Sequence, residues 1–483
     1  MIEKIKELTK DTAIYGISTI VGRFLGFLLV PFYTNIFSTY EFGVYSNIYA
    51  YIAFLNIVYI YGMDAAFLKY KSIAESSEEK KVFSTPYIFV TITTLIFSLI
   101  LLLLKAPLSD GMSVPTQYSY LLNYVILILI FDTLALVPFS NLRLQRKAGK
   151  FAVIKILNIL INLGLNIYLI IVLDYGIEGI FISNTIASAF SFIALLPEIV
   201  KYFIPKIDFD LLKKMLKFGI PYLPASIAAT IVQVIDRPIL VRLAGESALG
   251  IYQANYKLGI FMMLFVQMFQ YAWQPFFLNN AKDENAKRLF SKILTIYVIA
   301  SSLILVILSL FISDFAKIEI YGGRTIIGQE FLSGLYIVPV VLLAYVFHGM
   351  YVNFQAGIYI EEKTKYFPLV TGAGALINIV INILLIPQIG IMGAAVATLA
   401  SYFVMASGLF IVARKFYEIK YEFLKIGTIF LLVAAAGFVF YYIFGFEEVG
   451  IINKLLILLG FVSGLFIFRV VSKEEISSLK KLF

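Results

Sequence analysis

Long apolar runs alternate with short polar segments along almost the whole chain. A helix that crosses a bilayer needs about 20 predominantly apolar residues, and most of these runs reach that length. We therefore predict an all-α polytopic membrane protein with about fourteen transmembrane helices. The expected spans are residues 12–37, 42–66, 86–104, 118–139, 151–173, 177–197, 216–241, 249–273, 291–313, 331–355, 367–387, 390–412, 425–445 and 451–470.

The positions of lysine and arginine between these spans predict the orientation. Most of the 39 basic residues fall on one side when the connections are assigned alternately to the two sides of the membrane. That side is expected to be cytoplasmic, because cytoplasmic loops carry an excess of Lys and Arg. Both termini are then cytoplasmic. The opposite side has only Lys105, Arg242, Lys317, Arg324 and Lys454.

Composition excludes several classes of protein. Of the 483 residues, 61% are hydrophobic and only 14% are charged, which is outside the usual range of soluble domains. The chain has no cysteine and a single histidine, so thiolate and multi-histidine metal sites are excluded. It also has no P-loop sequence. We expect no cofactor, no metal, no nucleic-acid partner and no enzymatic activity.

Two sets of residues recur in order, six spans apart. Pro31, Gly43, Val44 and Tyr45 are matched at the same spacing by Pro238, Gly250, Ile251 and Tyr252. Asn162, Asn166 and Gly176-Ile-Glu-Gly179 are matched, with a two-residue gap, by Asn378, Asn382 and Gly390-Ile-Met-Gly393. Parallel repeats of this kind are typical of secondary transporters.

These repeats predict the division of the chain. We expect an N-terminal bundle at residues 1–205, a C-terminal bundle at 206–412, and an extra helix pair with a cytoplasmic tail at 413–483. In the segment that links the two bundles, Leu211, Leu212, Met215 and Leu216 are set among lysines, which predicts an interfacial helix.

With these residues the sequence resembles the polysaccharide transporters, or lipid-linked oligosaccharide flippases, of the multidrug/oligosaccharidyl-lipid/polysaccharide exporter superfamily. The resemblance covers the whole chain. It rests on Gly22, Arg23, Gly26 and Pro31, on Glu41-Phe-Gly-Val-Tyr45, on Leu249-Gly-Ile-Tyr252, on Ala272-Trp-Gln-Pro275 and on the Gly-Ile-x-Gly hairpins.

The resemblance implies two six-helix bundles around a central cavity lined by spans 1, 2, 7 and 8. It also implies that undecaprenyl-diphosphate-linked saccharides are moved to the outer leaflet of a bacterial cytoplasmic (inner) membrane. Membrane lipids and other polysaccharide assembly proteins, such as those of O-antigen biosynthesis, are further expected partners.

Charged residues inside the predicted spans are the candidate substrate-binding residues. A charge in the hydrocarbon core is costly and therefore faces a packed interior or a wet cavity. Spans 1, 7 and 8 hold the cations Arg23, Arg237 and Lys257 and the anion Asp236. This cationic excess suits a diphosphate, because Arg offers a bidentate fork and Lys a mobile charge. The alternatives are structural ion pairs, such as Arg23 with Asp132, and snorkelling of Arg237 to the interface.

Two titratable residues are candidates for coupling to H+ or Na+. Asp132 in the fourth span is one, because a desolvated carboxylate can have its pKa raised. His348 is the other, although a lone histidine is more often a hydrogen-bonding helix contact. Asp64 and Lys155 lie near predicted cytoplasmic ends, where snorkelling explains them. The asparagines spaced four apart are expected to form interhelical hydrogen bonds.

We therefore expect a flippase that works by alternating access and is coupled to a cation gradient. The alternative is a cation-coupled multidrug extruder of the same fold, which would need an acidic or aromatic cavity and is disfavoured by the cations of spans 1, 7 and 8. A membrane-embedded glycosyltransferase or polymerase would need clustered carboxylates in large outer loops. The longest outer loops, about residues 105–117 and 314–330, are short and lack such clusters.

Overall fold

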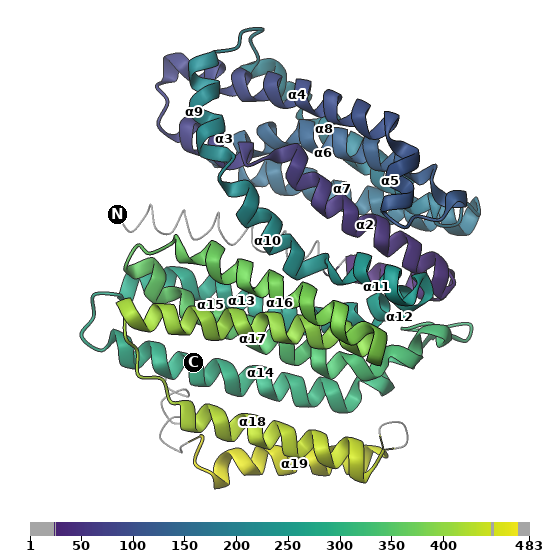
Figure 1. Cartoon of the computed structure of the whole chain (residues 1–483), viewed down its shortest axis with the longest axis vertical. Helices are drawn as coiled ribbons and strands as arrows, with labels where there is room; N and C mark the ends of the chain where they lie inside the picture. Colours follow the sequence, from purple (N-terminus) through teal and green to yellow (C-terminus); the bar gives the residue numbers. More distant parts are fainter. Residues whose placement is uncertain (1–23, 25, 446–448, 472–483) are drawn as a thin grey trace. The chain divides into compact units, whose positions relative to one another are not determined.

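The computed structural model describes residues 24, 26–445 and 449–471, and nearly all of them are helical (Figure 1). Eleven helical segments of this part are long and apolar enough to cross a membrane, and a shorter apolar helix follows at Ile451–Ile467. The prediction of an all-α membrane protein is confirmed. Of the expected first span, residues 12–37, only the C-terminal part is described, with residues 26–34 helical.

The chain divides into two compact units, Met1–Gln253 and Ala254–Phe483. In the first unit, α6 packs against α4, α7 and α8. The helices of this unit are α2 (Thr39–Ile60), α3 (Met63–Ser72), α4 (Glu79–Leu103), α5 (Lys105–Gly111), α6 (Leu121–Leu144), α7 (Ala148–Ile167), α8 (Glu178–Tyr202), α9 (Phe209–Gly219), α10 (Tyr222–Val234), α11 (Asp236–Ala244) and the start of α12 (Glu246–Tyr256).

In the second unit, α15, α16 and α17 lie side by side (Figure 1), and α14 packs against α15 and α18. A two-stranded antiparallel sheet follows α14, with Glu319 opposite Thr325. The elements are η4 (Lys257–Gly259), α13 (Ile260–Asn280), α14 (Ala286–Ala316), β1 (Glu319–Tyr321), β2 (Arg324–Thr325), η5 (Gln329–Ile337), α15 (Val338–Ile360), α16 (Tyr366–Ile389), α17 (Ile391–Phe416), α18 (Phe423–Phe438), η6 (Val439–Ile443) and α19 (Ile451–Ile467).

A helix is present in the segment that links the two expected bundles, as α9, and it lies beside α3 (Figure 1). Asp208 caps its start by accepting a hydrogen bond of 2.9 Å from the Leu211 N–H, and it also pairs with Lys81 at 2.5 Å. These two interactions hold the pKa of Asp208 below its usual range. The buried Leu212 and Met215 pack on an apolar cluster formed by Tyr61, Met63, Ala66, Val82 and Val90. The apolar face of α9 is therefore covered by protein.

The first residues of α2 and α12 cross at two glycines, which are the equivalent positions of the sequence repeat. A Cβ atom on Gly43 would overlap the backbone oxygen of Glu246, and a Cβ atom on Gly250 would overlap the backbone oxygen of Thr39. The contact is reciprocal, so each glycine leaves room for the backbone of the other helix. Only glycine allows two helices to approach so closely.

A buried carboxylate, one residue beyond the expected sixth span (177–197), holds the end of α8. Glu198 is 3% exposed and lies 3.6 Å from the ammonium groups of both Lys147 and Lys150. Asn141 of α6 donates a hydrogen bond of 3.2 Å to the same carboxylate. Because a buried charge is tolerated only when it is paired, this cluster fixes the connection between α6 and α7 against α8.

Candidate functional site

Span 7 is interrupted immediately before the two charged residues that the sequence analysis singled out. α10 ends at Val234 and α11 begins at Asp236, with Ile235 between them. Pro238 contributes to this break, since it has no N–H to continue the helical hydrogen bonds. A carboxylate in the first turn of a helix is favourable because it faces free N–H groups and the positive end of the helix dipole.

The carboxylate of Asp236 is buried, with 3% of the residue exposed. One oxygen accepts a hydrogen bond of 3.0 Å from the Arg237 backbone N–H. The other accepts a hydrogen bond of 2.6 Å from the Tyr252 hydroxyl of α12. Tyr252 is completely buried, so it braces the carboxylate and is closed to a substrate in this conformation.

Arg237 is half-buried, and its positive charge acts on the neighbouring Asp236 carboxylate without forming an ion pair with it. Its Nε donates a hydrogen bond of 3.0 Å to the side-chain oxygen of Gln253, and its charge acts on the hydroxyl of Tyr45. Among the described residues, no acidic side chain forms an ion pair with Arg237. The guanidinium is thus anchored through Nε, while its two terminal amino groups are left for another anion.

A chain of aromatic and amide side chains runs from Tyr45 into the first unit. The ring of Tyr45 lies 5.7 Å from that of Tyr33 and 4.7 Å from that of Tyr49. Tyr33 donates a hydrogen bond of 2.7 Å to Asn166 of α7, and Tyr49 accepts one of 2.8 Å from Asn184 of α8. These contacts connect four helical segments by polar groups that lipid could not satisfy.

Asp132 lies at the junction of α6, α7 and α8. Ser188 of α8 and the positively charged Lys155 of α7 are the polar side chains that act on its carboxylate. Both Asp132 and Lys155 keep exposed side-chain surface although many protein atoms surround them. The ammonium group of Lys155 also lies 4.4 Å over the ring of Phe139. The electrostatic contact with Asp132 was missed from the sequence, where Lys155 was assigned to snorkelling.

Lys257 and His348 belong to the second unit. Lys257 is half-buried at η4, the single 3-10 turn that interrupts the predicted eighth span. His348 lies on α15, with its ring 4.7 Å from that of Tyr402 and 6.4 Å from that of Tyr345. Tyr345 in turn hydrogen-bonds the hydroxyl of Tyr256, the residue before Lys257, at 3.3 Å. Arg23 lies outside the described residues.

The predicted interhelical role of the asparagines is confirmed for two of them. Asn158 of α7 donates to the backbone oxygen of Ala187 and to Ser191, both on α8. Asn166 accepts from Tyr33, as described above. In α16, Asn382 donates to Asn378 at 2.8 Å, within the same helix. Trp273 of α13 is 3% exposed and donates a hydrogen bond to the backbone oxygen of Asn353 of α15.

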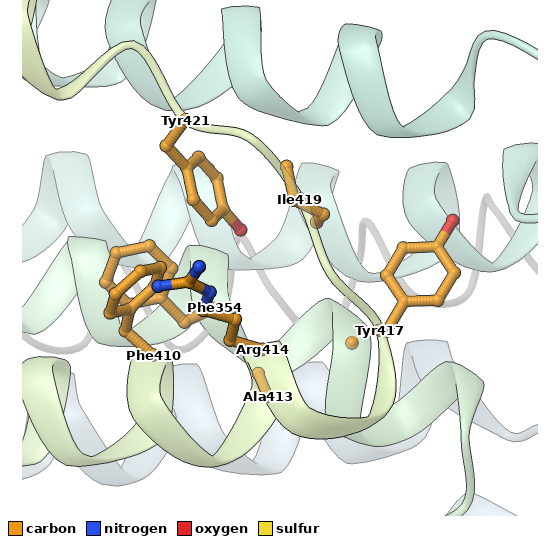
Figure 2. Close-up of a pocket in the computed structure, with 8 residues that line it drawn as sticks. Phe354, Phe410, Ala413, Arg414, Tyr417, Ile419 and Tyr421 are labelled. Atoms are coloured by element: carbon orange, nitrogen blue, oxygen red, sulfur yellow. The ribbon is translucent and has the colours of Figure 1, made fainter.

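A small pocket at the connection between α17 and α18 is too small for a substrate. Figure 2 shows Phe354, Phe410, Arg414, Tyr417 and Tyr421 around it. Its volume of about 10 Å³ has room for roughly one water molecule. Arg414 pairs at 3.4 Å with Glu418, so its charge is already matched. In the described part of the chain, no group of three or more His, Cys, Asp or Glu side chains is placed to hold a metal ion.

The fold is that of a known class of membrane transporters. A solved structure of the lipid II flippase MurJ, in an inward closed conformation, matches 94% of this chain and 98% of its own, with a TM-score of 0.74 and 18% identity. An inward-facing multidrug resistance MATE transporter matches 81% and 94%, with a TM-score of 0.65 and 13% identity. A MOP superfamily transporter from Pyrococcus furiosus matches 84% and 95%, with a TM-score of 0.58 and 14% identity. The protein has the MOP superfamily fold.

The family follows from the sequence. The family model described as "Polysaccharide biosynthesis protein" matches residues 8–281, which is more than half of the 483 residues. The chain therefore belongs to the polysaccharide biosynthesis protein family. A search of curated proteins found no match.

Proposed function

We propose that the protein is a flippase that moves undecaprenyl-diphosphate-linked oligosaccharide across the bacterial cytoplasmic membrane for cell-surface polysaccharide biosynthesis. It does so by alternating access of an N-terminal bundle (1–205) and a C-terminal bundle (206–412), with residues 413–483 as an added helix pair and tail and with both termini cytoplasmic. Family membership supports the substrate class, and the fold supports the transport mechanism.

The substrate proposal rests on how the Arg237 guanidinium is held and on which of its groups have no carboxylate partner. A half-buried guanidinium in a membrane-spanning segment is normally neutralised by a carboxylate. The adjacent Asp236 is instead engaged by Tyr252 and by the backbone, while Arg237 is anchored only through Nε. A fixed guanidinium with free terminal amino groups suits the bidentate geometry of a phosphate. Arg23, Lys257 and Asp236 are proposed as the further substrate-binding residues.

The first test is flipping of a diphosphate-linked oligosaccharide by the purified protein in proteoliposomes. We expect wild type to flip the substrate and Arg237→Ala to lose most of this activity, because charge-assisted hydrogen bonds contribute about 1.5–3 kcal/mol, or roughly 10- to 150-fold. Arg237→Lys should retain part of the activity, since it keeps the charge and loses the fork. Arg23→Ala is expected to behave like Arg237→Ala.

Arg414→Ala is the matched control, because Arg414 is exposed and already paired with Glu418. All variants are compared at equal amounts of folded protein. Equal flipping by wild type and Arg237→Ala would show that Arg237 is structural. Absence of flipping together with export of a cationic dye would replace the proposal by the multidrug extruder.

Cation coupling is proposed to use Asp132, with His348 as the second candidate. Asp132 supports this role because it is a carboxylate in a spanning helix, beside Ser188 and Lys155, that the protein leaves partly uncovered. We expect Asp132→Asn to flip substrate at a rate that no longer responds to an imposed H+ or Na+ gradient. Asp64→Asn, with the same change of charge near a helix end, should keep the wild-type response. Wild-type flux that is indifferent to both gradients would refute coupling itself.

A further inference from the structure

We propose that the exposed face of α9 is a docking surface for the headgroups of anionic phospholipids of the surrounding bilayer. The face carries Lys213, Lys214 and Lys217, all exposed, and it lies opposite the buried Leu212 and Met215. One acidic residue, Asp210, shares it, so three lysines against one aspartate leave two net positive charges. None of the three lysines has a carboxylate partner among the described residues.

The continuity of the chain places α9 at the level of the headgroups. Only Ile220 and Pro221 separate it from α10. Phe209–Val234 as a whole is long and apolar enough for a membrane span, but its four charged residues, Asp210, Lys213, Lys214 and Lys217, all lie in α9. Residues 222–244 of α10 and α11 already supply the roughly 20 residues needed to cross the hydrocarbon core. α9 therefore lies beyond that core, at the membrane surface.

The apolar residues beside the lysines indicate lipid and not water or a soluble partner. Phe209 is 75% exposed at the start of α9, and Ile220 is 51% exposed at its end. Both lie on the side of the helix that bears the lysines. An aromatic or aliphatic side chain next to a row of lysines is the pattern of a helix that inserts apolar groups between lipids while its ammonium groups reach phosphate.

The attachment of α9 to the protein makes the surface rigid. Tyr70 donates a hydrogen bond of 3.3 Å to the backbone of Lys214, and Lys69 lies 4.0 Å over the ring of Phe218. Gly62, which has a left-handed φ of +77°, packs its backbone against that of Gly219. Because its apolar face is already covered by α3 and α4, α9 cannot turn that face to the bilayer. The lysine face is the one that meets lipid.

The absence of cysteine from the sequence allows a site-specific test. Every protein variant carries Asp210→Cys labelled with a fluorophore and is reconstituted in bilayers of phosphatidylcholine. One set of bilayers contains a small fraction of spin-labelled phosphatidylglycerol, and the other contains the same fraction of spin-labelled phosphatidylcholine. We expect spin-labelled phosphatidylglycerol to quench more strongly, corresponding to a local enrichment of about fivefold, the effect of roughly one lysine at an anionic surface. High salt should remove the preference in the same protein.

The triple variant K213Q/K214Q/K217Q is expected to be quenched equally by the two lipids. The matched control K282Q/K292Q/K420Q, which neutralises three exposed lysines of the second unit, should keep the preference. Equal quenching in the lysine-intact protein would overturn the proposal, as would a preference that survives the triple variant. Quenching that high salt leaves unchanged, but that an added polyprenyl diphosphate abolishes for both lipids, would also overturn the proposal. It would assign the surface to the transported substrate.

Discussion

Gly43→Val is expected to abolish flipping while leaving the protein folded in the membrane. The substitution places methyl groups where the backbone oxygen of Glu246 lies, so α2 and α12 can no longer meet. Overpacking costs about 1–3 kcal/mol where the structure can adjust. If this contact closes one of the two alternating states, a penalty of about 3 kcal/mol lowers the population of that state roughly 150-fold. Gly250→Val should have the same effect, because the contact with Thr39 is reciprocal.

Separation of α2 from α12 can be measured independently of transport. Ser46 lies one turn after Gly43 and is 3% exposed, so a Ser46→Cys protein should react slowly with a membrane-impermeant maleimide. We expect the reaction to be much faster when Gly43→Val is added. Gly164→Val is the control, since a Cβ atom on Gly164 meets nothing within 4 Å. Wild-type flipping by Gly43→Val would show that this helix crossing does not take part in transport.

The same two glycines show what the sequence can predict. The spacing of Gly43 and Gly250 within matching segments identifies them as equivalent positions, because a repeat is a property of sequence alone. That they face each other is a property of packing. The break at Asp236 is similarly readable, since Pro238 prevents a regular hydrogen bond within the helix.

Other features depend on contacts between distant segments and have no local signal. The predicted eighth span, 249–273, is regular in its apolar pattern, yet η4 interrupts it at Lys257, where Gly259 packs against Val341 and Tyr345 of α15. Lys155 resembles a snorkelling lysine until α6 and α7 pack and bring it near Asp132.

The hydrogen bond from Tyr252 to Asp236 leads to the second large expected effect. Tyr252→Phe removes the hydrogen bond of 2.6 Å to a carboxylate that is 3% exposed and keeps the ring in place. Loss of a hydrogen bond to a buried charged group costs about 1.5–3 kcal/mol, because the oxygen is left without a partner or water. We expect a lower midpoint temperature for thermal unfolding of the purified protein. The carboxylate should also turn toward Arg237, which would weaken the proposed phosphate site.

The effect of Tyr252→Phe on thermal stability and its effect on flipping can be measured separately. Tyr168→Phe, which removes the hydroxyl of a tyrosine that is 51% exposed, should leave the midpoint unchanged. Adding Asp236→Asn to Tyr252→Phe should restore part of the lost stability. An uncharged amide is less costly to bury than a carboxylate that has lost its hydrogen bond from Tyr252. Flipping should then recover in parallel, since Arg237 no longer has a competing anion. Full stability of Tyr252→Phe would contradict a brace, and recovered stability without recovered flipping would give the negative charge of Asp236 a direct part in transport.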